Sequence, residues 1–540
     1  MCSSDLLILL FLLPSYVAAQ GSAASAGGVL PIMFATSDQC MACHNGLVSP
    51  EGEDVSIGAD WRASMMANSS RDPYWQAAVR RETLAHPGAV AAIENECSAC
   101  HMPMARFTAK AGRAMEPVFA NLPIGRSTAL HAPLAADGVS CSMCHQIQDK
   151  NLGTRESFTA GFAVDTGTGP ENRSIFGPYE VDAGRQRIMR SSAGFVPTQS
   201  LHVRKSEVCA TCHTLFTHSL GPGGEVVGEL PEQVPYLEWK HSSYRDRSSC
   251  QDCHMPVIRE PMPITAVMGV DREHFSRHSF RGGNFFMVRM LNRNRAGLGV
   301  TALPQELDAT ARRTISHLES SAARLTVTGV QVSGSELRAE VAVSNLAGHK
   351  LPSAYPSRRA WIHLTVSDRN GSVIFESGAF NQDGSIAGND NDLDPARYEA
   401  HYNLVDRPEK VQIYESILAA PDASVTTGLL KAVKYLKDNR VLPEGFDKET
   451  ADLDIAVQGS AMQDADFQGA GDRLTYLVDI EGSEGPFNVM AELWYQSIGY
   501  RWAKNLKEEQ AEEINRFVDY YDEMTESSPI ILARDSGESQ

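Results

Sequence analysis

The sequence lacks several features that would place it in a familiar class. Its 540 residues contain no run of about 18 consecutive apolar residues, the length that a membrane-crossing helix needs. Basic residues are outnumbered, 48 against 67 acidic residues, and the net charge of -19 argues against a nucleic-acid partner. A Rossmann glycine fingerprint, a P-loop and a serine nucleophile elbow are also missing. We therefore expect a folded chain without a transmembrane span in its mature form.

Cysteine is missing from the whole second half, which marks a sharp compositional boundary after Cys253. Ten of the 11 cysteines fall in five frames of the form Cys-x-x-Cys-His. The cysteine pairs are Cys40 and Cys43, Cys97 and Cys100, Cys141 and Cys144, Cys209 and Cys212, and Cys250 and Cys253. The histidines that complete the frames are His44, His101, His145, His213 and His254.

This spacing has a chemical reason. Two thiols three positions apart reach the two vinyl groups of one porphyrin, and the adjacent imidazole ligates its iron. Disulfides and zinc sites are the alternatives, but neither explains why a histidine follows every second cysteine. The sequence therefore predicts five covalently bound haem c groups, with the motif histidines as proximal ligands.

The ligand on the other face of each iron decides between an electron relay and an enzyme, because two histidines leave no position for a substrate. The candidates for this distal position are Met66, His131, His202, His241, His278 and His349. Three of them lie shortly before a motif, His278 precedes a glycine pair, and His349 follows Gly348 in an expected turn. Surface or packing roles are expected for His317 and His363, whereas the roles of His86, His218, His274 and His401 stay open.

Several segments around the motifs resemble a known group of proteins. They are Trp61 to Ala67, Gly138 to Cys141, Ser206 to Cys209 and Glu238 to Lys240. These segments are similar to multihaem cytochromes related to the tetrahaem cytochrome of ammonia oxidisers and to hydroxylamine oxidoreductase. The resemblance implies a mainly helical fold around closely packed haems, usually with two histidine ligands and sometimes with one open iron. Relatives often have a histidine where this chain has Met66, so Met66 is either a ligand that raises the potential or a packing residue.

The second half has the pattern of a β-domain. A helix is expected over 306–324, and apolar residues alternate with polar ones over 337–343 and 362–366. Asp368 to Gly371 predicts a hairpin turn into a strand at 373–375, because Asn-Gly accepts positive φ. We interpret this region as an immunoglobulin-like β-sandwich, followed by an amphipathic helix that packs on the protein rather than anchoring it to a membrane.

Two further interpretations concern ligands of this half. The segments Gly348 to Pro352 and Tyr355 to Arg359 resemble C-terminal domains of large secreted multihaem cytochromes, which implies that His349 points toward the haems. Arg358 and Arg359 are then candidates for pairing with haem propionates, with ordinary surface ion pairs as the alternative. A loop rich in oxygen donors is a candidate calcium site, although an acidic solvated turn fits it better; its residues are Asp383, Asp390, Asn391, Asp392 and Asp394.

The predicted fold class is multidomain α+β, a mainly helical or irregular pentahaem module followed by the β-sandwich and a C-terminal helix. The expected division is a signal peptide at 1–19, the haem module at 20–300, a helical linker at 301–324, the β-sandwich at 325–500 and the C-terminal helix and tail at 501–540. A signal peptide implies export to the periplasm or the outer cell surface.

The predicted function is electron transfer through five haems in a respiratory chain, between a membrane donor and a periplasmic or extracellular acceptor. One alternative is a redox enzyme that acts on a small nitrogen or sulfur compound at an open haem. A second alternative is that copies of the chain assemble as a homo-oligomer, in which each chain is a subunit of an extracellular cytochrome filament. A high-spin iron would indicate the enzyme, and length-dependent assembly would indicate the filament.

Overall fold

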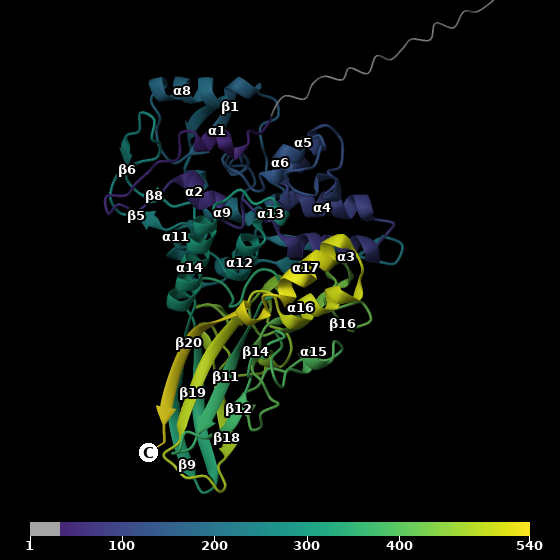
Figure 1. The fold of residues 1–540 in the computed structure, drawn as a ribbon, viewed down its shortest axis with the longest axis vertical. Helices are drawn as coiled ribbons and strands as arrows, with labels where there is room; N and C mark the ends of the chain where they lie inside the picture. Colours follow the sequence, from purple (N-terminus) through teal and green to yellow (C-terminus); the bar gives the residue numbers. More distant parts are fainter. Residues whose placement is uncertain (1–32, 540) are drawn as a thin grey trace, which may run out of the picture.

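The protein has two parts that differ in secondary structure. A computed structural model describes residues 33–539, so the expected signal peptide and Cys2 lie outside the described residues. Helices and short strands form one part, and the long strands of two sheets form the other (Figure 1). This mixture confirms the α+β fold class. Among the described residues, no helix is both long and apolar enough to cross a membrane.

The first part consists of helices joined by long loops. Its helices are α1 (Ser37–Met41), α2 (Ile57–Arg62), α3 (Pro73–Ala85), α4 (Val90–His101), α5 (Pro103–Ala111), α6 (Ala132–Ala136), α7 (Cys141–Cys144), α8 (Ala183–Ala193), α9 (Ser206–Ala210), α10 (Pro235–Lys240), α11 (Cys250–His254), α12 (Phe285–Arg293) and α13 (Arg295–Leu298). Short strands pair within the loops: β1 (Arg173–Gly177) with β2 (Phe195–Gln199), β3 (Leu215–Leu220) with β4 (Val226–Gln233), β5 (Val257–Ile258) with β8 (Phe275–Ser276), and β6 (Met262–Pro263) with β7 (Asp271–Arg272).

Each Cys-x-x-Cys-His motif begins in or lies within a helix, four of them in helices of a single turn. A helical turn places two cysteines three positions apart on the same face. The helix at the last motif is fixed by a capping box, in which Ser249 accepts from the backbone of Asp252 and the Asp252 side chain accepts in return. The local sequence thus forms the pairs of adjacent thiols that the motif requires.

Two sheets face each other in the second part. The four-stranded sheet has the order β13-β18-β10-β9, and the five-stranded sheet has the order β12-β11-β19-β20 with β14 added beside β11. Their strands are β9 (Ala323–Ser333), β10 (Glu336–Asn345), β11 (Arg359–Ser367), β12 (Val373–Ser377), β13 (Leu404–Val405), β14 (Ile413–Tyr414), β18 (Gly471–Asp479), β19 (Asn488–Gln496) and β20 (Pro529–Glu538). A smaller sheet contains β15 (Ser416–Ala419), β16 (Val425–Thr426) and β17 (Lys434–Asp438).

Several expectations for this half are confirmed. The helix expected over 306–324 is α14 (Pro304–Ser321), and the alternating strands are β10 and β11. The hairpin turn is present, with Gly371 at φ 79° two residues before β12. The immunoglobulin-like classification of the two sheets stays a prediction.

The C-terminal region differs from the expected helix and tail. The helix is α17 (Glu512–Asp522), preceded by the short α16 (Tyr500–Lys504), but the residues after it form β20. This strand pairs antiparallel with β19 and buries Leu532, because the stretch from Pro529 to Ala533 is almost wholly apolar. The chain therefore returns to complete the five-stranded sheet.

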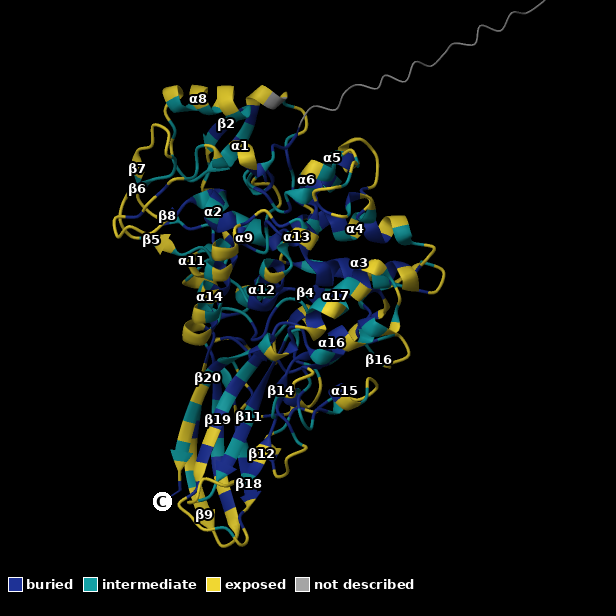
Figure 2. Cartoon of the chain, viewed as in Figure 1, coloured by how far each residue is buried: buried dark blue, intermediate teal, exposed yellow. Residues whose placement is uncertain are grey.

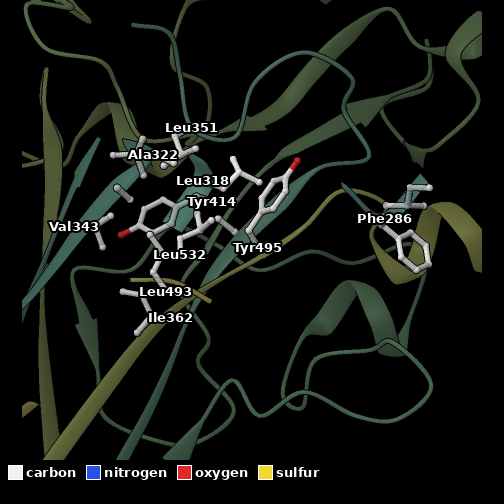
Figure 3. Close-up of a cluster of buried hydrophobic side chains, with 14 of the residues drawn as sticks. Phe286, Leu318, Ala322, Val343, Leu351, Ile362, Tyr414, Leu493, Tyr495 and Leu532 are labelled. Carbon is white, nitrogen blue, oxygen red and sulfur yellow. The ribbon is translucent and has the colours of Figure 1, made fainter. Parts of the chain in front are cut away.

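One hydrophobic core runs through both parts. Figure 3 shows side chains of α12, α14 and both sheets in this core, among them Phe286, Leu318 and Leu493. Burial is continuous from the sheets into the helices above them (Figure 2). The helix α17 packs on α3, where Arg80 forms a two-fold ion pair with Glu513 at 2.8 and 2.9 Å. The C-terminal helix is thus a packing element between the two parts.

We expect Leu493→Ala to lower the free energy of unfolding by about 3 kcal/mol, because Leu493 is fully buried in the core and its truncation leaves a cavity. Met490→Ala is the matched control in the same strand, since Met490 is 37% exposed, and we expect a loss under about 1 kcal/mol there. Urea denaturation followed by far-ultraviolet circular dichroism measures both. Equal losses in the two variants would contradict the described packing of β19.

Candidate functional site

The candidate site is a cavity of about 730 Å³ in the first part. We number the motif sites in chain order: site 1 (Cys40, Cys43, His44), site 2 (Cys97, Cys100, His101), site 3 (Cys141, Cys144, His145), site 4 (Cys209, Cys212, His213) and site 5 (Cys250, Cys253, His254). All residues of sites 1 to 4 line the cavity. Site 5 lies at its margin, where the neighbouring residues Gln251 and Met255 line the wall. The fold thus brings motifs spread over more than 200 residues of sequence around one space.

Contacts between thiols give the spatial order of the sites. The thiols of Cys40 and Cys141 are close enough to interact, and α1 contacts α7, which places site 1 beside site 3. The same relation between Cys100 and Cys212 places site 2 beside site 4. Site 4 also adjoins site 5, through the thiols of Cys209 and Cys250. Sequence spacing alone does not predict this order.

Four of the five motif histidines are held by a backbone carbonyl. In each of them the ring nitrogen Nδ1 donates to the carbonyl. His44 donates to Ile264 at 2.7 Å, and His101 donates to Ser69 at 2.8 Å. His145 donates to Phe176 at 2.6 Å, and His254 donates to Arg281. A carbonyl can only accept, so the proton is on Nδ1 and Nε2 keeps its lone pair. This is the arrangement that orients metal-ligating histidines in proteins.

The charge state of these rings also suits a metal ligand. Burial lowers the pKa of His101 and of His254 to about 4, so both imidazoles are neutral at neutral pH. Neutral imidazole is the form that binds a metal ion.

Two of the candidate distal histidines face a motif histidine across a gap. The ring of His278 lies parallel to that of His145, with centres 6.2 Å apart and planes 21° apart. His349 faces His254 in the same way, at 6.3 Å and 14°. When two imidazoles bind the same metal ion from opposite sides, each with a nitrogen at about 2.0 Å, their ring centres lie about 6 Å apart. The gaps at sites 3 and 5 therefore have the width that one six-coordinate iron needs.

The other candidate ligands are placed less simply. Both ring nitrogens of His202 are engaged, one with Ser200 at 2.6 Å and one with the Ile147 carbonyl at 2.7 Å, so ligation requires that one of these bonds break. In His241 the nitrogen Nε2 donates to the Asp447 carbonyl at 3.0 Å. His131 keeps Nε2 free, because its partner Glu116 contacts Nδ1 at 2.8 Å. Met66 lines the cavity, and no contact assigns it to a particular site.

A buried ion-pair network fixes the segment that carries His349. The ammonium of Lys350 contacts Asp438 at 2.7 Å, and Arg440 bridges Asp438 at 2.7 Å to Glu238 at 3.0 Å. Glu238 belongs to α10 and also accepts from the Lys350 backbone at 3.1 Å. The network therefore joins the sheet part to the helical part directly beside site 5.

Two expectations about charged residues need correction. Arg358 lines the cavity, but Arg359 is buried and pairs with Asp392 at 2.8 Å, so it is not available to a propionate. Asp392, which pairs with Arg359, is one of the carboxylates of the candidate calcium loop. A second carboxylate of that loop, Asp390, pairs with Arg397. The loop is held by arginines in part of its length rather than being simply solvated.

A buried group of His401, Asp464 and Asp472 lies outside the cavity lining and offers three metal-type ligand atoms. The amide of Gln412 is fixed, because its oxygen accepts from the Tyr402 backbone, and its nitrogen donates to His401 Nδ1 at 2.8 Å. The proton of His401 is therefore on Nε2, which donates to Asp464 at 2.9 Å. An imidazole arranged in this way has no lone pair for a metal ion.

Sequence reasoning missed several residues of the cavity wall. Tyr74 and Glu82 of α3 and Glu232 of β4 line the cavity, although no motif contains them. His317, expected on the surface or in packing, lies close enough to His349 for the two charges to interact, and burial lowers its pKa to about 4. No sequence pattern marks these residues, because only the tertiary fold brings them together.

Comparison with solved structures shows a likeness in fold. The fold is similar to the crystal structure of a penta-heme cytochrome c552 from Thermochromatium tepidum, with a TM-score of 0.54 and 17% sequence identity. The alignment covers 94% of this chain and 100% of that chain. No protein-family model and no curated protein matches the sequence. At this identity the likeness shows that the two chains share a fold.

We expect Asp438→Asn to lower the free energy of unfolding by about 3 to 5 kcal/mol at pH 7, because Lys350 and Arg440 lose their buried counter-charge. Burial opposes ionisation of Asp438, but the charges of Arg440 and Lys350 outweigh it and hold its pKa well below the usual value. This contribution is present above the unfolded pKa of about 4 and is lost as the pH falls toward the lowered folded value.

Urea denaturation at several pH values tests this expectation. The stabilities of the wild type and Asp438→Asn should converge in acid, whereas the exposed control Asp452→Asn, whose side chain makes no cap hydrogen bond, should follow the wild type throughout. A difference that stays constant down to acid pH would show that the charge of Asp438 is not the cause.

Proposed function

We propose that this protein is a multihaem c-type cytochrome that binds five haem c groups covalently and transfers electrons. The observation that carries the proposal is the pair of facing imidazoles at sites 3 and 5, each spaced for one iron beside a Cys-x-x-Cys-His motif. The shared fold with a penta-heme cytochrome c552 supports it. The residues present fit the group, since adjacent thiols, an oriented imidazole and an apolar-walled cavity occur together.

The residues have distinct tasks in this proposal. The two thiols of each motif form thioether bonds to the porphyrin, and Nε2 of the motif histidine ligates the iron. The backbone carbonyls of Ile264, Ser69 and Phe176 hold the rings in place. Haem, when bound, supplies an iron that accepts and releases one electron. His278 and His349 close the second face at their sites, so substrates have no access to the iron there.

The order of the sites supports a relay rather than five independent centres. Neighbouring thiols connect site 2 to site 4, site 4 to site 5, and site 1 to site 3. Site 3 joins the others because the thiols of Cys144 and Cys212 are close enough for their charges to interact. We propose redox proteins as partners, a membrane donor and a periplasmic or extracellular acceptor, with export directed by residues 1–19.

The finer description of the architecture is also part of the proposal. The two facing sheets form an immunoglobulin-like β-sandwich that follows a haem module, with the boundaries given above. The role of this domain is to supply His349 to site 5, and the buried network around Asp438 supports that role.

Site 4 favours a second candidate function, a redox enzyme with one open haem. His213 differs from the other motif histidines, because no carbonyl partner of its ring is found among residues 33–539; it shares with His44 and His101 the lack of a facing histidine there. Burial and the charge of Arg358 lower its pKa. Polar groups from the second half line the cavity, among them Tyr355, Arg358 and Asn284, whose Oδ1 is buried without a partner. Such a wall fits a small anionic or polar ligand.

The haem-to-protein ratio tests the proposed function directly. The protein is produced in a host that matures c-type haem, and the covalent haem is quantified against the peptide by mass spectrometry. We expect five haems, and replacement of any one cysteine pair by serine should remove a single haem. Fewer than five covalent haems in the wild type would contradict the proposal.

We expect His278→Ala and His349→Ala each to convert one iron from low spin to high spin, because each variant removes one of two ligands. His363→Ala is the control, since His363 lies on β11 and does not line the cavity. Its ring contacts Glu376 at 3.0 Å. Low-temperature EPR of the oxidised protein measures the change. An unchanged low-spin spectrum in either variant would show that the facing histidine is not the ligand at that site.

A further inference from the structure

Apart from Arg358, which lies near His213 of site 4, the acidic and basic side chains of the cavity wall are separated from each other. The four carboxylates of the wall come from the N-cap of α3, from α3 itself, from α4 and from β4. Three of its four guanidinium groups come from α8, from the turn before α9 and from β7. The acidic residues are Asp72, Glu82, Glu96 and Glu232, and the basic residues are Arg185, Arg204, Arg272 and Arg358. In Figure 1, α3 and α4 lie at the right of the helical part, whereas α8 and β6, the partner of β7, lie at its upper left. The cavity therefore has an acidic end and a basic end.

The acidic end is centred on site 2. Glu232 is 5% exposed, and its carboxylate accepts from Thr217 at 2.5 Å and from Gln233 at 3.4 Å. Among the described residues, no cation lies within 4.0 Å of it. Glu96 directly precedes Cys97 of site 2 and contacts His218 of β3 at 3.3 Å, which places the β3–β4 hairpin that carries Glu232 beside this site. Glu82 and Glu96 line the cavity together with Glu232 and the residues of site 2.

The basic end is centred on site 3. The guanidinium groups of Arg204 and Arg272 lie 5.5 and 5.6 Å from the ring centre of Tyr179. In the part of the chain that the structure describes, neither arginine has a carboxylate within 4.0 Å. Tyr179 follows β1 by two residues, and β1 contains Phe176, whose carbonyl holds His145 of site 3. Two cations without acidic partners thus lie beside site 3.

We propose that this separation of charge gives the relay a direction, with site 2 as the low-potential entrance and site 3 as the high-potential exit. The proposal rests on the proposed haem function. Reduction adds a negative charge to a haem, which Glu232 opposes at site 2 and which Arg204 and Arg272 favour at site 3. Pairing of these arginines with haem propionates acts in the same direction, because it also reduces the negative charge near the iron.

The contacts between thiols supply a route between the two ends. Cys100 of site 2 adjoins Cys212 of site 4, and Cys212 interacts with Cys144 of site 3. One electron passes along this route from a reduced redox protein at the α3–α4 surface to an oxidised redox protein at the α8 surface. The donor loses one electron, the acceptor gains one, and no covalent bond forms or breaks. The helix α8 suits an acidic acceptor, since its 11 residues include three arginines and no carboxylate. Arg185 pairs with the N-cap Asp182, whereas Arg187 and Arg190 have no carboxylate within 4.0 Å among the described residues.

Potentiometric titration of the five-haem protein at pH 8 tests the direction. Burial raises the pKa of Glu232 to about 7, so the group is mainly ionised at this pH. We expect Glu232→Gln to raise one midpoint potential by a tenfold change in the reduction equilibrium, about 59 mV. Arg272→Gln should lower a different midpoint by a smaller amount, about threefold in the equilibrium, because water screens this less buried group.

The order of the two affected midpoints decides the proposal. In the wild type, the midpoint that Glu232→Gln moves should lie below the one that Arg272→Gln moves. The matched controls are Glu319→Gln on the exposed face of α14 and Arg187→Gln on the exposed face of α8, and neither should move a midpoint.

Two results would overturn the inference. One is the reverse order of the two midpoints, and the other is the absence of a shift in variants that carry five haems. A haem count below five in the wild type would instead refute the haem function itself, so the two failures are distinguishable.

Discussion

The hydrogen bond from Nδ1 of a motif histidine to a distant backbone carbonyl is the interaction on which the proposed site depends. It fixes the tautomer and the plane of the ring, and it directs Nε2 away from the chain that holds it. The carbonyl that holds His44 belongs to Ile264, 220 residues further along the chain. Ligand geometry at site 1 is therefore a property of the whole helical part, and a motif taken alone has two thiols and an imidazole without a fixed direction.

The second half extends the same principle from one ring to a pair. His349 faces His254 because β17 and the segment after it supply Asp438 and Arg440, whose charges join Lys350 to Glu238 of α10. Burying four ionised groups costs solvation, and such a network is retained where it fixes one arrangement of neighbouring elements. In the proposed function, the sheet part supplies His349, and this network holds the segment that carries it.

The sequence predicts the local features well and the tertiary ones poorly. The motifs, the helix α14 and the strands β10 and β11 follow from spacing and periodicity, which are local. The choice among distal candidates does not, since His202 and His241 lie shortly before a motif yet make other contacts, whereas His278, which precedes a glycine pair, faces a motif ring. Glu232 and β20 were missed for the same reason: a buried carboxylate and a short apolar tail acquire their roles only from partners that lie far away in the chain.

The most direct test of the account is the low-temperature EPR spectrum of the oxidised wild-type protein, recorded after its covalent haem has been quantified. The facing rings at sites 3 and 5 have planes only 21° and 14° apart. Near-parallel imidazoles give rhombic low-spin signals, so the account predicts two such irons among the five. High-spin signals from these two irons, or signals typical of perpendicular imidazoles, would contradict the claim that the fold presets the ligand pairs.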